Sequence, residues 1–107
     1  MIKKAGLFKY RLDGESLEII PMGEIDHHSA VKLRGQTDEL INNENPKILV
    51  LNLEEINFMD SSGLGFIMGR YALMQKKSGK LVVKKPSKSV MKICSLAGLE
   101  RMVKIER

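Results

Sequence analysis

The amino-acid sequence predicts one α/β domain with a mixed, mainly parallel β-sheet that begins with an N-terminal β-hairpin and carries about three to four α-helices. Three observations support this prediction: an Asp-Gly pair between two extended segments, an apolar run in mid-chain, and helical periodicity on both sides of that run. At 107 residues the chain has room for one hydrophobic core, so we expect residues 1–107 to form one domain.

The hairpin is predicted at the N-terminus. Residues 7–12 alternate apolar and polar side chains, Asp13 and Gly14 follow, and residues 17–22 resume an extended pattern. Asp-Gly is a strong hairpin signal because a tight turn needs positive φ at its central positions, and we expect both residues to occupy those positions. Two antiparallel strands should therefore open the sheet.

A helix and a central strand come next. From residue 29 to about residue 43 apolar positions recur at helical spacing, and Gly35 weakens this helix only slightly. The expected core face of the helix consists of Ala30, Val31, Leu33, Thr37, Leu40 and Ile41. After Pro46, residues 48–53 are almost continuously apolar, which is typical of a central strand buried on both faces.

The second half of the chain alternates helices with strands. Residues 64–74 repeat apolar positions at helical spacing, and residues 81–83 read as a strand. Residues 90–97 form the apolar face of a third helix that Gly98 closes, and residues 102–105 form a short last strand. This alternation implies right-handed crossover connections between parallel strands.

The composition is that of an ordinary globular protein, with 43% hydrophobic and 29% charged residues. The apolar stretch after Lys3 and Lys4 is too short for a signal-peptide core, and no run approaches the roughly 20 apolar residues that span a bilayer. The single cysteine, Cys94, excludes an internal disulfide and is expected to be buried on the third helix. We therefore expect a cytoplasmic protein.

Lysines concentrate in one stretch of a chain whose net charge is +5. The seven are Lys76, Lys77, Lys80, Lys84, Lys85, Lys88 and Lys92. One interpretation is a site for nucleic acid or an anionic surface, and the other is a solvated, solubilising face. The second is favoured because this stretch contains no aromatic residue on which bases would stack.

A motif rich in serine and glycine lies where a strand gives way to the second helix, an edge at which open α/β sheets meet ligands and partners. The side chain of Asp60 or Ser61 is suited to cap that helix. Glycines in a helix cost about 0.5 to 1 kcal/mol each relative to alanine, so close packing or a docked partner must favour them. We expect Gly63 and Gly65 to let a partner approach the backbone.

Two segments carry a resemblance to a known family. One is Phe-Met-Asp-Ser-Ser-Gly-Leu-Gly at residues 58–65, followed by Gly-Arg-Tyr at residues 69–71, and the other is Gly-Glu-Ile-Asp-His-His at residues 23–28. Together they resemble the STAS domain of anti-sigma-factor antagonists, and the similarity extends over nearly the whole chain. It is strongest to antagonists of the sporulation pathway, and an antagonist in general-stress regulation is the alternative.

The resemblance implies a binding function that phosphorylation switches off, in the regulation of transcription. In that family the unphosphorylated antagonist binds an anti-sigma factor that is also a serine kinase, and so releases a sigma factor. The kinase phosphorylates the serine directly after the motif's aspartate, here Ser61, and a PP2C-type phosphatase restores it. The residues expected to contact the partner are Asp26, Asp60, Ser62, Gly63, Leu64, Gly65 and Arg70. Because the chain ends at Arg107, we expect no contact from a longer tail.

Other readings of these residues are weaker or remain open. His27 and His28 have no third ligand at zinc-site spacing, and Ser61 does not lie on a Gly-x-Ser-x-Gly elbow. We therefore expect no enzyme activity, no metal and no cofactor. Asp26 is equally suited to cap the first helix, and Arg70 is either a partner contact or a solvated helix charge.

Overall fold

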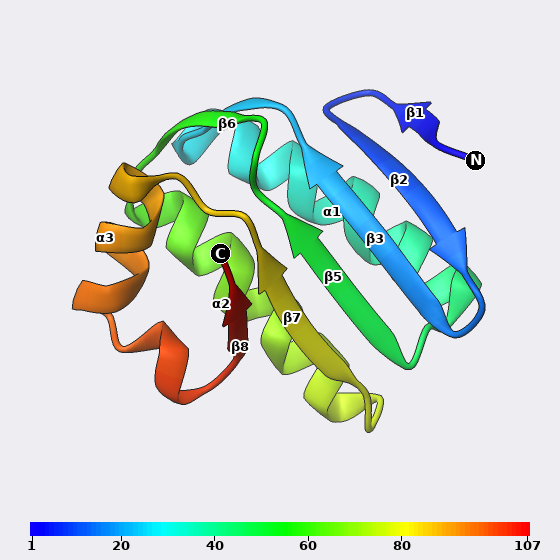
Figure 1. Cartoon of the computed structure of the whole chain (residues 1–107). Coiled ribbons are helices and arrows are strands. Elements are labelled where there is room, and N and C mark those ends of the chain that lie inside the picture. Colours follow the sequence, from blue (N-terminus) through cyan, green and yellow to red (C-terminus); the bar gives the residue numbers. More distant parts are fainter.

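Six strands form the main sheet of the computed structural model, which describes all residues from 1 to 107 (Figure 1). Their order across the sheet is β1-β2-β3-β5-β7-β8, with antiparallel pairing from β1 to β3 and parallel pairing from β3 to β8. The predicted mixed, mainly parallel sheet with an N-terminal hairpin is thus confirmed. The strands are β1 (Lys3–Ala5), β2 (Phe8–Asp13), β3 (Ser16–Pro21), β5 (Ile48–Asn52), β7 (Lys80–Lys84) and β8 (Lys104–Glu106).

Three α-helices accompany the sheet: α1 (His27–Glu44), α2 (Ser61–Lys76) and α3 (Lys88–Leu96), with a short 3-10 turn at Leu99–Arg101. Helix α1 begins two residues earlier than the sequence predicts because Asp26 caps it. None of the three helices combines the length and the apolar composition that crossing a membrane requires.

Three short strands escaped the sequence analysis: β1 in the main sheet and two strands outside it. Strand β4 (Gly23–Ile25) and strand β6 (Ile56–Met59) pair in parallel as a separate two-stranded sheet. With three and four residues they are too short for alternation to reveal them. Each lies directly before a helix, β4 before α1 and β6 before α2, so their pairing brings the two helix starts together.

The hairpin turn differs by one residue from the prediction. Asp13 pairs with Ser16, so the two loop residues are Gly14 and Glu15, and only Gly14 has a positive φ, of 61°. A two-residue turn with glycine at its first central position is the type II′ pattern. Asp13 therefore ends β2 and is not a turn residue.

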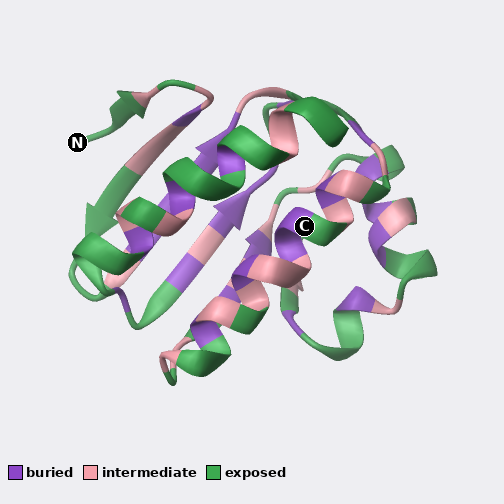
Figure 2. Ribbon diagram, turned by 180° about the vertical axis from the view of Figure 1, so that it is seen from behind, coloured by how far each residue is buried: buried purple, intermediate pink, exposed green.

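Helices α1 and α2 cover one face of the sheet, as the view from behind shows (Figure 2), and α3 packs beside α2. Alternate strand residues face these helices and form the core, among them Leu17, Ile19, Leu49, Leu51, Leu81 and Val83. Strand β5 is central, as predicted, but burial on both of its faces was wrong. Ile48 is 37% exposed and Val50 only half-buried, because no helix covers the second face.

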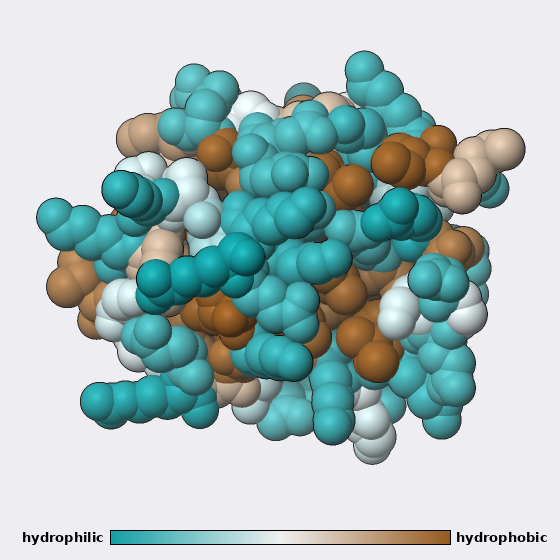
Figure 3. Space-filling view, in the orientation of Figure 1, coloured by the Kyte–Doolittle hydropathy of each residue, from teal (hydrophilic) through white to brown (hydrophobic).

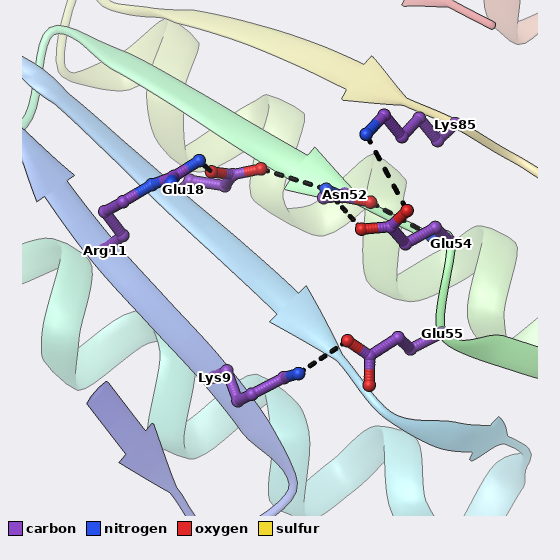
Figure 4. Close-up of polar contacts among 7 residues, drawn as sticks. All are labelled: Lys9, Arg11, Glu18, Asn52, Glu54, Glu55 and Lys85. Carbon is purple, nitrogen blue, oxygen red and sulfur yellow. Dashed lines mark hydrogen bonds and ion pairs between the residues drawn. The ribbon is translucent and has the colours of Figure 1, made fainter. Parts of the chain in front are cut away.

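That second face is polar over most of its area (Figure 3), and its charged side chains bond to one another above the strands (Figure 4). Glu18 accepts hydrogen bonds from Arg11 and from Asn52, whose Nδ2 lies 3.0 Å from Glu18 Oε2. Burial raises the pKa of Glu18, but the bonds from Asn52 and Arg11 outweigh it and leave the pKa below its ordinary value. The ion pairs Lys9–Glu55 and Lys85–Glu54 extend this network to the loop before β6.

Candidate functional site

The starts of α1 and α2 lie next to each other at one edge of the molecule. Ile25 pairs with Met59 across the β4–β6 ladder, so the residues that follow them, Asp26 and Asp60, leave the ladder together. The backbone N–H of Asp60 also donates to the carbonyl of Ile25, with N and O 3.3 Å apart. The geometry thus brings together two acidic residues that the sequence analysis placed in the partner site.

Asp60 caps α2, which settles the choice left open between Asp60 and Ser61. Its backbone is extended, and its Oδ1 accepts the N–H of Ser62 at 2.8 Å. Ser61 is therefore the first helical residue, with an exposed side chain, whereas Ser62 is half-buried. Of the two serines, Ser61 is the more open to an approaching enzyme or partner.

Asp26 caps α1 in a capping box. Its Oδ1 accepts the N–H groups of His28 and Ser29 at 2.9 and 2.8 Å, and Ser29 Oγ accepts the N–H of Asp26. The bond from the Ser29 backbone is the main reason that the pKa of Asp26 lies below its ordinary value. The capping interpretation of Asp26 is confirmed, and its carboxylate remains only partly buried beside the start of α2.

The two glycines of the motif differ sharply in their surroundings. Gly63 is buried, and a Cβ at this position would lie 2.0 Å from Met59 Cγ and 3.4 Å from Ile25 Cβ. Gly65 is exposed, and a Cβ there would meet no atom within 4 Å. Gly63 therefore serves internal packing between α2 and the β4–β6 pair, and only Gly65 offers bare backbone to a partner. Leu64, between them, is half-buried against the core.

Arg70 is not the solvated helix charge that was one of its two interpretations, because it is buried and paired within the chain. Its side chain is 4% exposed, with Nε 2.8 Å from Asp38 Oδ1 on α1, and its Nη2 donates to Asp38 Oδ2 at 3.3 Å. The Nε–Oδ1 contact lacks hydrogen-bond alignment, so the pair is held by charge and by one bond. The guanidinium also lies 5.0 Å from the centroid of the Phe66 ring, and burial lowers the pKa of Arg70. We therefore withdraw Arg70 as a contact residue.

Two exposed apolar side chains near the site were missed by the sequence analysis. Phe58 in β6 is 49% exposed, three residues before Ser61. Val31 was placed on the core face of α1, yet it is 68% exposed, because the buried stripe of that helix is Leu33, Thr37 and Ile41. The spacing of four between these three buried residues was the sequence signal that could have excluded Val31 from the core face.

His27 and His28 begin α1 directly after Asp26 and so lie beside this site, whereas Cys94 and the lysines belong to other parts of the chain. His27 and His28 are exposed, and no three His, Cys, Asp or Glu side chains are grouped so that they could hold a metal ion. Cys94 is buried, and burial raises the pKa of its thiol. The seven lysines are spread over the end of α2, β7, α3 and the connections between them, and Lys85 is paired with Glu54.

Comparison with known proteins supplies the family. The sequence profile of the STAS domain matches residues 10–107. An anti-sigma F factor antagonist of Paenibacillus polymyxa is 40% identical over 83 residues, which are 78% of this chain and 71% of that protein. An anti-sigma-B factor antagonist of Bacillus subtilis is 31% identical over 83 residues, 78% of this chain and 74% of that protein.

A solved structure has the same fold. Unphosphorylated SpoIIAA, an anti-sigma factor antagonist, superposes with a TM-score of 0.79 at 28% identity, covering 94% of this chain and 88% of that one. The phosphorylated form of SpoIIAA from Bacillus gives a TM-score of 0.73 at 27% identity, covering 94% of this chain and 91% of that one. In profile, sequence and fold alike, the chain belongs to the STAS-domain family.

Proposed function

We propose that this protein is an anti-sigma factor antagonist of the sporulation type. In its unphosphorylated form it binds an anti-sigma factor that is also a serine kinase, and the bound kinase releases its sigma factor. Phosphorylation of Ser61 ends this binding, and a PP2C-type phosphatase restores it. The protein itself acts by binding and catalyses no reaction.

The observation that supports this proposal best is the setting of Ser61. Its exposed side chain begins α2, directly after the capping residue Asp60 and beside Asp26. Exposed Phe58 and Gly65 flank it. The similarity to SpoIIAA, a protein known in unphosphorylated and phosphorylated forms, supports the same modification here.

Phosphorylation at this position changes charge more than structure. The phosphate brings a charge of about −1.5 to −2 next to Asp60, while the N-terminal end of α2 attracts anions by about 0.3 to 1 kcal/mol. These opposing effects nearly cancel in the free protein. In a complex, docking would remove water from the phosphate, and an unpaired interfacial charge costs about 2 to 5 kcal/mol. At 1.4 kcal/mol per tenfold, binding weakens by about 30- to 3000-fold.

The test is a calorimetric titration of the anti-sigma F factor of P. polymyxa with wild type, Ser61→Ala, Ser61→Asp and Ser62→Ala. Wild type, Ser61→Ala and Ser62→Ala should bind, and Ser61→Asp should bind at least 30-fold more weakly. Circular dichroism of each variant checks folding. Equal affinities of Ser61→Asp and wild type would refute the switch.

Two further measurements complete the test. Incubation of each variant with the same factor and ATP, followed by mass spectrometry, should place one phosphate on wild type and on Ser62→Ala, and none on Ser61→Ala. The anti-sigma B factor of B. subtilis serves as a second titrant and separates the two pathways. Tighter binding to that factor would assign the protein to stress regulation, and binding to neither factor would overturn the proposal.

A further inference from the structure

A groove between α1 and α2 opens beside the start of α2. One wall consists of His27, Ala30, Val31 and Arg34 from α1, and the other of Ser62, Gly65 and Phe66 from α2. The α1 residues recur at intervals of three and four, so they form one stripe along that helix. The groove has a volume of about 250 Å³, which is room for one or two side chains of a partner.

Three of the seven residues that line the groove are hydrophobic: Ala30, Val31 and Phe66. Val31 is 68% exposed and lies off the buried stripe of its helix. Opposite it, Gly65 presents bare backbone with no atom within 4 Å of a would-be Cβ. Phe66 closes the floor, itself 3% exposed and held in place over Arg70. A partner side chain in the groove would lie between Val31 and Gly65, above the buried Phe66.

One rim of the groove carries a positive charge, on Arg34, that forms no ion pair within the chain. Arg34 is exposed and takes part in none of the five ion pairs of the protein. The nearest acidic residue one turn along α1, Asp38, is already engaged by Arg70. Arg34 lies close enough to Arg70 for its charge to help burial lower the pKa of that residue. A carboxylate on the occupant would complement the charge of Arg34.

We propose that this groove receives a segment of the anti-sigma factor in which an apolar side chain, seated between Val31 and Gly65, is followed by a carboxylate that pairs with Arg34. The inference rests on the proposed function and extends its docking surface from the start of α2 onto α1. The apolar side chain supplies buried area, and the Arg34 pair sets orientation and association rate.

The test uses the anti-sigma F factor of P. polymyxa and two variants with matched controls. Val31→Asp places a carboxylate in the apolar part of the groove and should weaken binding by about 30-fold or more. Its control, Leu96→Asp, makes the same kind of change at an 81% exposed position on α3 and should leave affinity unchanged. Thermal unfolding should be near that of wild type for both, because both side chains are exposed.

Arg34→Gln removes the rim charge and should slow association about three- to tenfold, with a weaker dependence of the rate on salt. Lys76→Gln removes the same charge at the far end of α2 and should leave the rate as in wild type. Ser61→Asp is measured in parallel. If Val31→Asp and Arg34→Gln bind like wild type while Ser61→Asp fails to bind, the groove is not a docking site. The proposed function then remains intact. Ser61→Asp that binds like wild type overturns the proposed function, whatever the groove variants do.

Discussion

Replacing each of the two motif glycines by alanine should have opposite effects on stability. Gly63 and Gly65 are two residues apart in α2, so alanine improves intrinsic helix propensity at both by about 0.5 to 1 kcal/mol. Only their surroundings differ. At Gly63 the new Cβ would lie 2.0 Å from Met59 Cγ, whereas at Gly65 it would lie in open space.

The magnitudes follow from that contrast. Gly65→Ala should raise the free energy of unfolding by the helix term alone, which corresponds to about 2 to 8 °C in Tm for a domain of this size. In Gly63→Ala, Met59 is 4% exposed and must move within the core, at a cost of about 1 to 3 kcal/mol for overpacking. Because the helix term is common to both variants, the difference between them isolates this packing cost of about 1 to 3 kcal/mol.

The assay is urea unfolding of wild type and both variants, followed by circular dichroism. A double-mutant cycle adds Met59→Ala alone and with Gly63→Ala, and the combined variant should lose less stability than the sum of the two single changes. Equal stability of Gly63→Ala and Gly65→Ala, or additive effects in the cycle, would refute the packing contact between Gly63 and Met59.

Three other residues give checkable outcomes. Asp38→Ala leaves the buried guanidinium of Arg70 unpaired and should lower the free energy of unfolding by about 1 to 3 kcal/mol. The lower part of this range is favoured because Asp38 is 32% exposed. Adding Arg70→Met should recover part of the loss in urea unfolding. The folded-state pKa of Glu18 is lowered, so its carboxylate stabilises the fold above its ordinary value of 4.5 and loses that contribution as the pH falls below it. Glu18→Gln should therefore flatten the acid limb of a stability–pH curve, and an unchanged limb would contradict this. Cys94, buried with a raised pKa, should react with a thiol reagent only after urea unfolding, as absorbance would show.

The order of the long elements was predictable because each has a period or a run long enough to read. The apolar run around β5 and the helical spacing in α2 survive in the structure almost as the sequence predicts. The short strands β4 and β6 do not, since three or four residues carry no period. These two strands nonetheless determine that Asp26 and Asp60 lie together.

Residue environments were predictable only where the partner lies nearby in the chain. Asp60 caps a helix through a bond to Ser62, two residues away, and it was one of the two caps, Asp60 or Ser61, that sequence reasoning proposed. Arg70 pairs with Asp38, 32 residues away, and no local pattern marks that pair. The burial of Gly63 depends in the same way on Ile25 across the β4–β6 ladder.

In α1 the hydrophobicity of a residue does not determine whether it is buried. Thr37 is fully buried because its Oγ1 donates to the carbonyl of Leu33 at 2.8 Å, which satisfies the hydroxyl within the helix. Val31 is two positions from Leu33, roughly 200° around the helix, and so points away from the sheet. Val31 therefore lies off the core stripe of α1 and lines the groove beside Gly65.

The site and the groove share one physical basis, since both depend on how firmly α2 is held against α1. The β4–β6 pairing fixes the first residues of the two helices, and the buried Arg70–Asp38 pair fixes them again about two turns further along α2. Between these two fixed points lie Ser61, Gly65 and Val31, all exposed and none needed for the core. In the proposed switch, a phosphate on Ser61 therefore adds charge at a position that the core does not need. We expect its electrostatic cost to fall mainly on binding and little of it on folding.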